Sequence, residues 1–366
     1  MLLAANFYAL ASKFAGNFAL TSEESDMTNI IKPFKNIVVF MPRFLGDCIN
    51  CTPALKLLEA SYPNTKITLV IRTIPAQAFD RNENFQLIID ERPKNKVQGI
   101  ISLIKSLKNE SFDAGILMTN TLIDAALARI SGVKNLVGYE KEFRKPLLTK
   151  ALHLDIRRHY INRYAYITNA LCGNSHKMLP EVELFFDKTQ SVLAGINKTK
   201  IGFCIVNKDK LSRHYPVIHS AEVIHLLNQQ LQKPTSFYML GAPEEAVEAE
   251  QVVSLCQEKG TVNIHSLAGK TTIAQLIDTI ADLDLLITVD SGPLHVAAAT
   301  KTTTIALQSK GTSPFSNVCP KGKQVTVINN AGNYINDDDQ ILDISPELIA
   351  KTALELLENT PPLSAT

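Results

Sequence analysis

Two short segments hold the residues whose types and spacing are best suited to chemistry. The first is Arg43-Phe-Leu-Gly46-Asp47, which lies between an apolar run and a helical pattern. Gly46 permits a tight turn with the backbone close to a ligand. Asp47 then stands at the start of a helix, either as its N-cap or as a general base that takes a proton from an incoming hydroxyl. The residues alone leave both interpretations open.

The second segment is Asp290-Ser291-Gly292-Pro293-Leu-His295, where a buried run ends and a helix rich in small residues begins. We expect the N–H groups of Ser291, Gly292 and Leu294 to point out of the helix N-terminus, which favours a phosphate. Asp290 would accept hydrogen bonds from a sugar hydroxyl. His295 lies one turn further on, and the alternative for it is a satisfied buried histidine. The segment therefore predicts a phosphate site.

Two further segments carry groups that would support this site. Lys208, Lys210 and Arg213 follow a predicted strand and could neutralise a diphosphate, although a solvated loop would look similar. Gly269-Lys270-Thr271 follows another predicted strand and should line the same cleft. Its spacing is not that of a Walker loop.

The composition restricts the class of protein. The 366 residues are 45% hydrophobic and 20% charged, with a net charge of +1. These values exclude a disordered chain and a polytopic membrane protein, and they give no global attraction to nucleic acid. Six cysteines are too few for a disulfide scaffold and suit a reducing cytosol. Cys48 and Cys51 form a C-x-x-C pair without further ligands at zinc spacing, so we expect buried thiols and no metal.

Positioning these segments requires alternating strands and helices. Apolar runs at 37–41, 66–71, 86–90, 114–118 and 136–139 alternate with helical patterns at 48–60, 97–108 and 122–130. A second series of strands covers 201–206, 236–240, 263–266, 285–289, 303–307 and 324–328, with helices at 188–196, 221–232, 244–259, 272–281, 294–299 and from 346. Such runs predict an α/β protein with two doubly wound, Rossmann-like domains, residues 30–187 and 188–366, facing a central cleft. The final helix could instead pack back on the first domain.

Residues 1–26 form a separate N-terminal extension. Leu3, Phe7, Leu10, Phe14 and Phe18 fall on one helical face, which predicts an amphipathic helix. The segment has neither the basic start nor the cleavage site of a signal peptide. It would dock on the protein or lie in a membrane interface, or Met27 would be the natural start of the chain.

The two site segments together resemble the bacterial ADP-heptose:lipopolysaccharide heptosyltransferases of glycosyltransferase family 9. The likeness covers about residues 36–330 and includes Gly132-Val-Lys-Asn-Leu-Val-Gly138-Tyr139, Arg213-His-Tyr-Pro216 and Leu240-Gly-Ala-Pro. It implies a GT-B fold, with an acceptor-binding domain before a nucleotide-sugar-binding domain. It also implies an inverting, metal-independent transfer of heptose from ADP-heptose to the Kdo or heptose of an inner-core lipopolysaccharide.

The resemblance implies roles for individual residues. Asp47 matches the base, and Arg213 replaces a frequent lysine that would stabilise the departing diphosphate. The expected donor site comprises Lys208, Gly269, Lys270, Thr271, Asp290, Ser291, Gly292, Pro293 and His295. Basic side chains of the first domain, among them Arg43, Arg72 and Arg144, fit an acceptor that bears carboxylates and phosphates.

The expected partners are ADP-heptose and a lipid A-core acceptor, with no metal cofactor, nucleic acid or protein partner implied. The enzyme would be cytoplasmic and peripheral at the inner membrane. Segments 204–210 and 307–314 depart from the family pattern and leave a different nucleotide sugar open. A protein or glycan acceptor, a GT-B-fold sugar-nucleotide epimerase or hydrolase, and a binding protein without catalysis stay open as well.

Overall fold

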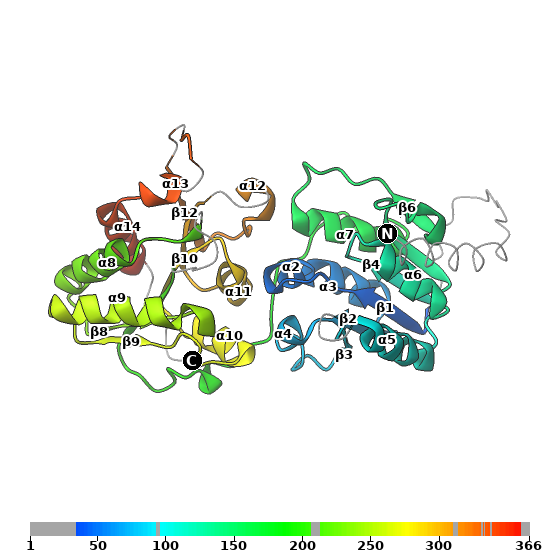
Figure 1. Ribbon diagram of the computed structural model, residues 1–366, viewed down its shortest axis with the longest axis horizontal. Helices are drawn as coiled ribbons and strands as arrows, with labels where there is room; N and C mark the ends of the chain where they lie inside the picture. The colour runs from blue at the N-terminus through cyan, green and yellow to red at the C-terminus, as the bar shows by residue number, and fades with distance from the viewer. Residues whose placement is uncertain are drawn as a thin grey trace. The chain divides into compact units, whose positions relative to one another are not determined.

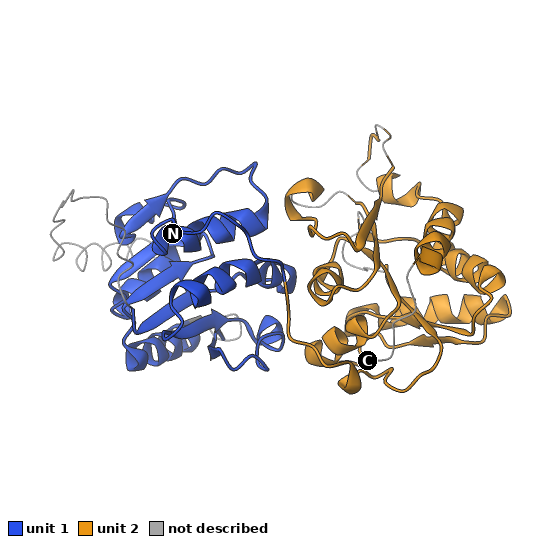
Figure 2. Cartoon of the chain, turned by 180° about the vertical axis from the view of Figure 1, so that it is seen from behind, with its two compact units in different colours: residues 1–182 blue, residues 183–366 orange. Residues whose placement is uncertain are grey.

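Apolar, β-branched runs form the strands of two parallel sheets, one in each of two compact units, residues 1–182 and 183–366 (Figure 2). The structure is a computed structural model that describes residues 34–92, 96–205, 213–309, 314–330, 332, 334–336 and 339–359. The predicted extension 1–26 and the cations Lys208 and Lys210, predicted to support the phosphate site, lie outside the described residues.

The first sheet has the strand order β3-β2-β1-β4-β5-β6. Its strands are β1 (Asn36–Phe40), β2 (Lys66–Ile71), β3 (Phe85–Ile89), β4 (Ala114–Leu117), β5 (Asn135–Tyr139) and β6 (Lys150–Leu152). All neighbouring pairs are parallel; Ile37 of β1, for example, lies opposite Ile67 of β2 and Ala114 of β4. The strand order reverses between β1 and β4, which is where open α/β sheets bind ligands.

Helices cover both faces of this sheet (Figure 1). Helix α3 (Thr52–Ser61) packs on α7 (Tyr160–Leu171), and α5 (Lys96–Glu110) packs on α6 (Leu122–Ile130). Val38 and Phe40 share a core cluster with Leu103 and Leu107 of α5. Because side chains alternate along a strand, Ile37 and Val39 face the opposite layer. The short helices α2 (Leu45–Asn50) and α4 (Thr73–Ala76) follow β1 and β2.

The second sheet repeats the plan with the order β12-β11-β10-β7-β8-β9. Its strands are β7 (Thr199–Cys204), β8 (Thr235–Met239), β9 (Ile264–Ser266), β10 (Leu285–Val289), β11 (Thr304–Leu307) and β12 (Val325–Ile328). The larger helices are α8 (Val217–Gln230), α9 (Ala246–Glu258), α10 (Ile273–Ala281), α11 (Gly292–Thr300) and α14 (Pro346–Asn359). Short helical turns of this unit are α12 (Phe315–Val318), α13 (Asp339–Leu342), η2 (Lys188–Gln190) and η4 (Pro243–Glu245), whereas η1 (Lys145–Leu147) lies in the first unit. The strand order reverses between β7 and β10.

The last helix belongs to the second unit. Ile349, Ala350 and Ala353 of α14 are buried in the core cluster of that unit, and α14 packs on α8. The Tyr215 hydroxyl donates a hydrogen bond to the carbonyl of Ile344, just before α14, at 2.7 Å. The sequence left open whether this helix packs on the first domain, and its apolar face lies in the second.

Several elements differ from the sequence-based expectation. The short strand β6 and the short helices α4, α12 and α13 were not predicted. The helix expected at 48–60 is broken at Cys51, because Pro53 has no N–H to donate to the carbonyl of Ile49; the Thr52 hydroxyl donates to that carbonyl instead, at 2.8 Å. The short helix expected at 188–196 is only the 3₁₀ turn η2. Helix α7 was not predicted, although Ile161, Tyr164, Ala165 and Thr168 follow its buried face.

The unit boundary falls at residues 182 and 183, whereas the sequence placed it between 187 and 188. The backbone N–H of Asp187 donates to the carboxylate of Asp278 in α10, at 2.8 Å. Leu184 is buried as well. These contacts attach residues 183–187 to the second unit.

Candidate active site

The predicted donor residues gather at one edge of the second sheet. Since its strands are parallel, their carboxyl ends meet at the same edge. Arg213 follows β7, residues 240–243 follow β8, residues 267–271 follow β9 and residues 290–293 follow β10. Four segments that lie far apart in the sequence therefore contribute to one place in the second unit.

Arg213 and Asp290 form a direct pair where the strand order reverses. Arg213 Nη2 lies 3.4 Å from Asp290 Oδ2, and Nη1 donates to the Asp290 carbonyl at 3.2 Å. The Asp290 residue is only 4% exposed. A guanidinium carries five N–H groups, so Arg213 can hold Asp290 and bind an anion at the same time. The sequence predicted both residues for the donor site but did not predict that they pair.

The turn that starts α11 presents fewer donors than the sequence suggested. Ser291 is the N-cap residue, with extended backbone and no side-chain cap, and Pro293 lies within the first turn. The N–H of Leu294 donates to the Ser291 carbonyl at 3.2 Å and is not offered to a ligand. Ser291 and Gly292 are left as the backbone N–H groups that could bind phosphate. His295 is buried within α11, and its buried Nδ1 atom makes no hydrogen bond to the described residues.

The loop at 267–271 is fixed against the loop after β8. The N–H of Gly269 donates to the Gly241 carbonyl at 2.9 Å, and Gly269 has φ of +71°. A Cβ atom on Gly269 would approach the Pro243 Cα to 2.9 Å, so both the backbone conformation and the space require glycine. Lys270 Nζ donates to the Ser266 carbonyl at 2.9 Å and pairs with Glu250 at 3.3 Å. Thr271, beside them, is half-buried.

Cys319 is a neighbour of this site that the sequence did not predict. Burial, with a smaller contribution from the Asp290 carboxylate, raises the pKa of the Cys319 thiol to about 11. Nothing in the pattern around Cys319 identifies it, because the contact depends on how the chain after β11 returns to the end of β10.

In the first unit, Asp47 is not the N-cap of its helix. Helix α2 begins at Leu45 with Phe44 as N-cap, which places Asp47 in the first turn. The capping interpretation is therefore wrong, and a half-buried carboxylate stands near the positive end of the helix. Burial raises the pKa values of Cys48 and Cys51 well above the ordinary range, with smaller contributions from neighbouring charges that include Asp47. Both thiols are buried, as expected.

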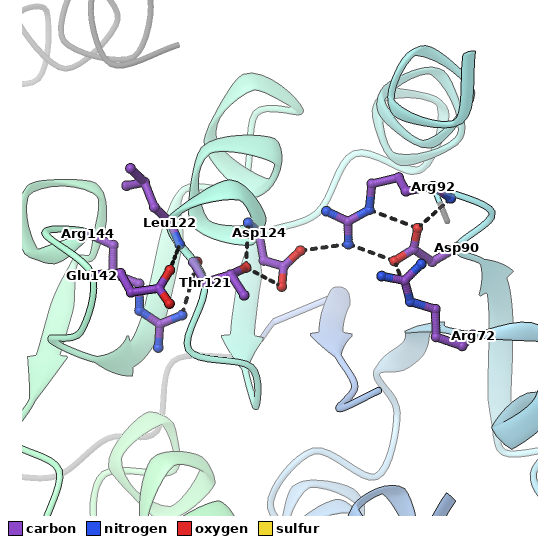
Figure 3. A network of polar contacts seen from close by, with 8 residues as sticks. All are labelled: Arg72, Asp90, Arg92, Thr121, Leu122, Asp124, Glu142 and Arg144. Atoms are coloured by element: carbon purple, nitrogen blue, oxygen red, sulfur yellow. Dashed lines mark hydrogen bonds and ion pairs between the residues drawn. The ribbon is translucent and has the colours of Figure 1, made fainter. Parts of the chain in front are cut away.

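A ladder of ion pairs joins the carboxyl ends of several strands in the first unit (Figure 3). Arg72 follows β2, Asp90 and Arg92 follow β3, and Asp124 lies in α6 after β4. Arg92 donates to Asp90 at 2.8 Å through Nε and at 2.6 Å through Nη2, and Nη2 also reaches Asp124 Oδ1 at 2.7 Å. Arg72 Nε lies 3.4 Å from Asp90 Oδ2. Asp90 was the last residue of the predicted strand 86–90, and the other three follow predicted strands, but only Arg72 was predicted as a site residue.

The ladder favours the charged forms of Asp90 and Arg92. Burial would raise the pKa of Asp90, but the hydrogen bonds and charge of Arg92, together with the charge of Arg72, hold it below its usual value. Burial likewise opposes the charge of Arg92, and the two carboxylates raise the Arg92 pKa above its usual value. Burial lowers the pKa of Arg72, and the nearby charges of Arg92 and Arg43 lower it further against the opposing charges of Asp90 and Asp124.

The three basic residues predicted for the acceptor side differ in what they can contact. Arg43 is exposed and lies over the Phe44 ring, 5.4 Å from its centroid. Arg72 is half-buried, and its Nη1 atom is buried without a hydrogen-bond partner.

Arg144 has a structural role instead. It is 0% exposed and donates to the Tyr139 carbonyl at 2.7 Å, the Thr121 carbonyl at 3.3 Å and Asn120 Oδ1 at 3.2 Å. Burial lowers its pKa to about 10. The expectation that Arg144 contacts an acceptor is corrected, because its donors are used inside the protein.

The family follows from comparison with known proteins. The family described as glycosyltransferase family 9 (heptosyltransferase) matches residues 100–341. The chain belongs to this family. The chain is 25% identical over 288 residues to lipooligosaccharide heptosyltransferase 2 of Campylobacter jejuni, covering 77% of this chain and 85% of the relative.

Solved structures of the family share the fold. Escherichia coli ADP-heptose lipopolysaccharide heptosyltransferase II matches with a TM-score of 0.75 and 19% identity, over 88% of this chain and 98% of that one. A family 9 glycosyltransferase from Veillonella parvula matches with a TM-score of 0.76 and 23% identity, over 90% and 99%. The predictions of the family, of a GT-B α/β fold and of a glycosyltransferase are confirmed.

The described residues hold neither a membrane span nor a metal cluster. No helix among them is long and apolar enough to cross a bilayer. They also contain no group of three or more His, Cys, Asp or Glu side chains arranged to hold a metal ion.

Proposed function

We propose that this glycosyltransferase moves heptose from ADP-heptose to the Kdo or heptose of an inner-core lipopolysaccharide, with inversion and without a metal ion. The observation that supports this most strongly is the Arg213–Asp290 pair at the strand reversal of the second sheet, in a chain of the heptosyltransferase family. A buried carboxylate held by an arginine can accept hydrogen bonds from sugar hydroxyls while the guanidinium faces phosphate.

The second unit, assigned to residues 188–366 from the sequence, would bind the donor. The N–H groups of Ser291 and Gly292 would hold a phosphate, and Pro293 and His295 would shape the start of α11 behind it. Gly269, Lys270 and Thr271 would lie near the nucleotide, and Lys208 would add positive charge. Arg213 would stabilise the leaving diphosphate, the role that a metal ion plays in other transferases.

The first unit, assigned to residues 30–187, would bind the acceptor. Asp47 would take the proton of the acceptor hydroxyl as its oxygen attacks the anomeric carbon. The bond from that carbon to the diphosphate oxygen breaks in the same displacement, which inverts the configuration and releases ADP. Arg43 and Arg72 would bind acceptor carboxylates or phosphates, since a partner there would satisfy the buried Nη1 of Arg72.

The acceptor is a lipid, so we place the enzyme in the cytoplasm as a peripheral protein of the inner membrane. Its partners in this proposal are ADP-heptose and the lipid A-core acceptor, and no protein partner is needed for the reaction.

Release of ADP from ADP-heptose, with and without Kdo-lipid A, tests the proposal. We expect release to require the acceptor and Asp47→Ala to lower kcat by about 10² to 10⁴-fold, the usual contribution of a general base. Asp80→Ala removes an exposed carboxylate of the same unit and serves as the matched control, with activity unchanged. Equal release without acceptor would favour the hydrolase or epimerase alternative, and full activity of Asp47→Ala would exclude Asp47 as the base.

A further inference from the structure

The turn after β5 holds an aromatic side chain in water at a conformational cost. Phe143 is 88% exposed, and both Glu142 and Phe143 have positive φ, of +50° and +59°. Residues other than glycine and asparagine rarely adopt this left-handed backbone conformation, and bulky aromatic residues do so least readily. Neither burial nor backbone preference explains why a phenylalanine occupies this position.

The turn is nevertheless built firmly (Figure 3). The Glu142 carboxylate accepts the N–H of Leu122 at 3.1 Å. The buried Arg144 binds the Tyr139 carbonyl at one side of the turn and the Thr121 carbonyl beyond it. Strain that the surrounding structure enforces in this way is a reason to look for a function.

The next turn along the same edge presents a second apolar side chain. β5 and β6 are parallel neighbours, with Tyr139 opposite Leu152, so the turns that follow them adjoin. Glu140 connects the two turns through Lys145 at 3.0 Å and His153 at 3.5 Å. Beyond β6, Ile156 is 66% exposed.

Exposed cations flank both apolar side chains. Lys141 and Lys145 lie on either side of Phe143, and the Arg157 side chain, next to Ile156, is 88% exposed. Residues 140–158 carry six Lys or Arg against three Asp or Glu. Glu140 pairs with Lys145, Asp155 pairs with Arg157, and Glu142 accepts a backbone N–H. The segment therefore keeps a net excess of three positive charges, and one of its six cations is the buried Arg144.

Apolar side chains that protrude between cations are the chemistry that an anionic lipid surface selects, because the apolar groups enter the headgroup region while the cations pair with phosphates. We propose that Phe143, Ile156, Lys141, Lys145 and Arg157 form a lipid-binding surface that places the carboxyl edge of the first sheet against an anionic bilayer. The inference rests on the proposed function in one respect: that function assigns this edge to a lipid-anchored acceptor.

Sedimentation with lipid vesicles tests the surface in the full chain. The probes are phosphatidylcholine vesicles with and without phosphatidylglycerol, in the absence of nucleotide sugar and acceptor. We expect the wild type to partition preferentially onto the anionic vesicles and Phe143→Ser to lower the partition coefficient about tenfold, since an aromatic side chain is lost from the interface. Arg157→Glu should lower it by about tenfold as well, through charge reversal.

Matched controls separate this surface from general exposure and charge. Val262→Ser removes an apolar side chain that is 74% exposed in the second unit, and Lys134→Glu reverses an exposed charge at the opposite end of β5. Both should bind vesicles as the wild type does. Phe143→Gly removes the same side chain but relieves the backbone, so it should fold readily and bind as weakly as Phe143→Ser.

The proposal is overturned if the wild type does not bind anionic vesicles more strongly than neutral ones, or if the Phe143 variants bind anionic vesicles as well as Val262→Ser does. It is also overturned if Phe143→Gly loses transfer to a soluble, deacylated acceptor while vesicle binding is intact, since Phe143 would then serve the sugar site. The vesicle measurement contains no reaction, so its result is independent of whether the transferase proposal holds.

Discussion

At the scale of single residues, the two units place charge at the ends of their strands in different ways. In the second unit, the pair of Arg213 with Asp290 lies where the strand order reverses, and Lys270 pairs with Glu250 after β9. The first uses the ladder Arg72–Asp90–Arg92–Asp124, in which every carboxylate is bound by a guanidinium. Buried ion pairs of this kind position groups more than they add stability, but removing one partner leaves the other uncompensated.

Asp90 should therefore be sensitive to substitution in a pH-dependent way. We expect Asp90→Asn to lower the free energy of unfolding by about 3 kcal/mol at pH 7, because Arg92 loses its principal partner. The folded-state pKa of Asp90 lies below its unfolded value, so its contribution is complete above about pH 4 and is lost as the pH falls through the lower folded value.

Denaturant unfolding from pH 3 to 7 measures this difference. Asp80→Asn, at an exposed carboxylate, should change the free energy by less than about 0.5 kcal/mol. If Asp90→Asn and the wild type unfold alike at pH 7, the ladder does not carry the charge coupling that its geometry indicates.

At the scale of elements, the turns after strands and helices owe their shapes to a few backbone positions, such as Gly269 after β9 and Gly260 after α9. Gly269 and Gly260 both have positive φ, of +71° and +86°. A Cβ at Gly269 would meet the Pro243 backbone at 2.9 Å, whereas one at Gly260 would meet nothing within 4 Å. Alanine at Gly260 therefore measures the cost of the backbone conformation alone, and alanine at Gly269 adds the clash between two loops.

Gly269→Ala should therefore be the more harmful of the two alanine variants. We expect Gly260→Ala to cost about 1 kcal/mol of stability, from the left-handed conformation. Gly269→Ala should cost about 1 to 3 kcal/mol more, because the loops must separate, and should raise KM for the nucleotide sugar. Thermal unfolding and donor-dependent kinetics measure the two effects. Equal behaviour of the variants would show that the loop at 267–271 is not held by its contact with Pro243.

At the scale of the whole molecule, each unit has its own sheet and its own buried core. The described residues of the proposed donor site all lie in the second unit, and Asp47 with the ion-pair ladder lies in the first. The two substrates should therefore stabilise different parts of the chain, since a bound ligand stabilises the structure that it contacts.

Hydrogen exchange on the full chain distinguishes the units. Added ADP should slow exchange at the start of α11 and in residues 267–271 by about tenfold or more at saturation. It should leave the ladder region around Asp90 and Asp124 unchanged, and this region is the internal control. Protection that appears equally in both units would contradict the assignment of the donor to the second.

The sequence by itself determined the class of fold and most strands and helices, because apolar periodicity, Gly and Pro act over neighbouring residues. The family motifs around Asp47 and Asp290 likewise lie in single segments, so they could be recognised without a structure. The break at Cys51 was also local in origin, since Pro53 is visible in the sequence, although the prediction passed over it.

Only the tertiary structure decided which charges meet. Arg213 and Asp290 are 77 residues apart, and Arg92 and Asp124 are 32 apart. The residues next to each of these charges in the sequence do not indicate that parallel strands bring them to one edge, or which side-chain rotamers they adopt there. The same is true of Arg144, which looks like any exposed arginine in the sequence. It is buried because it donates to acceptors in two segments, Asn120 with Thr121 and Tyr139. Contacts between distant segments depend on the order and register of the strands, and the folded chain as a whole sets both.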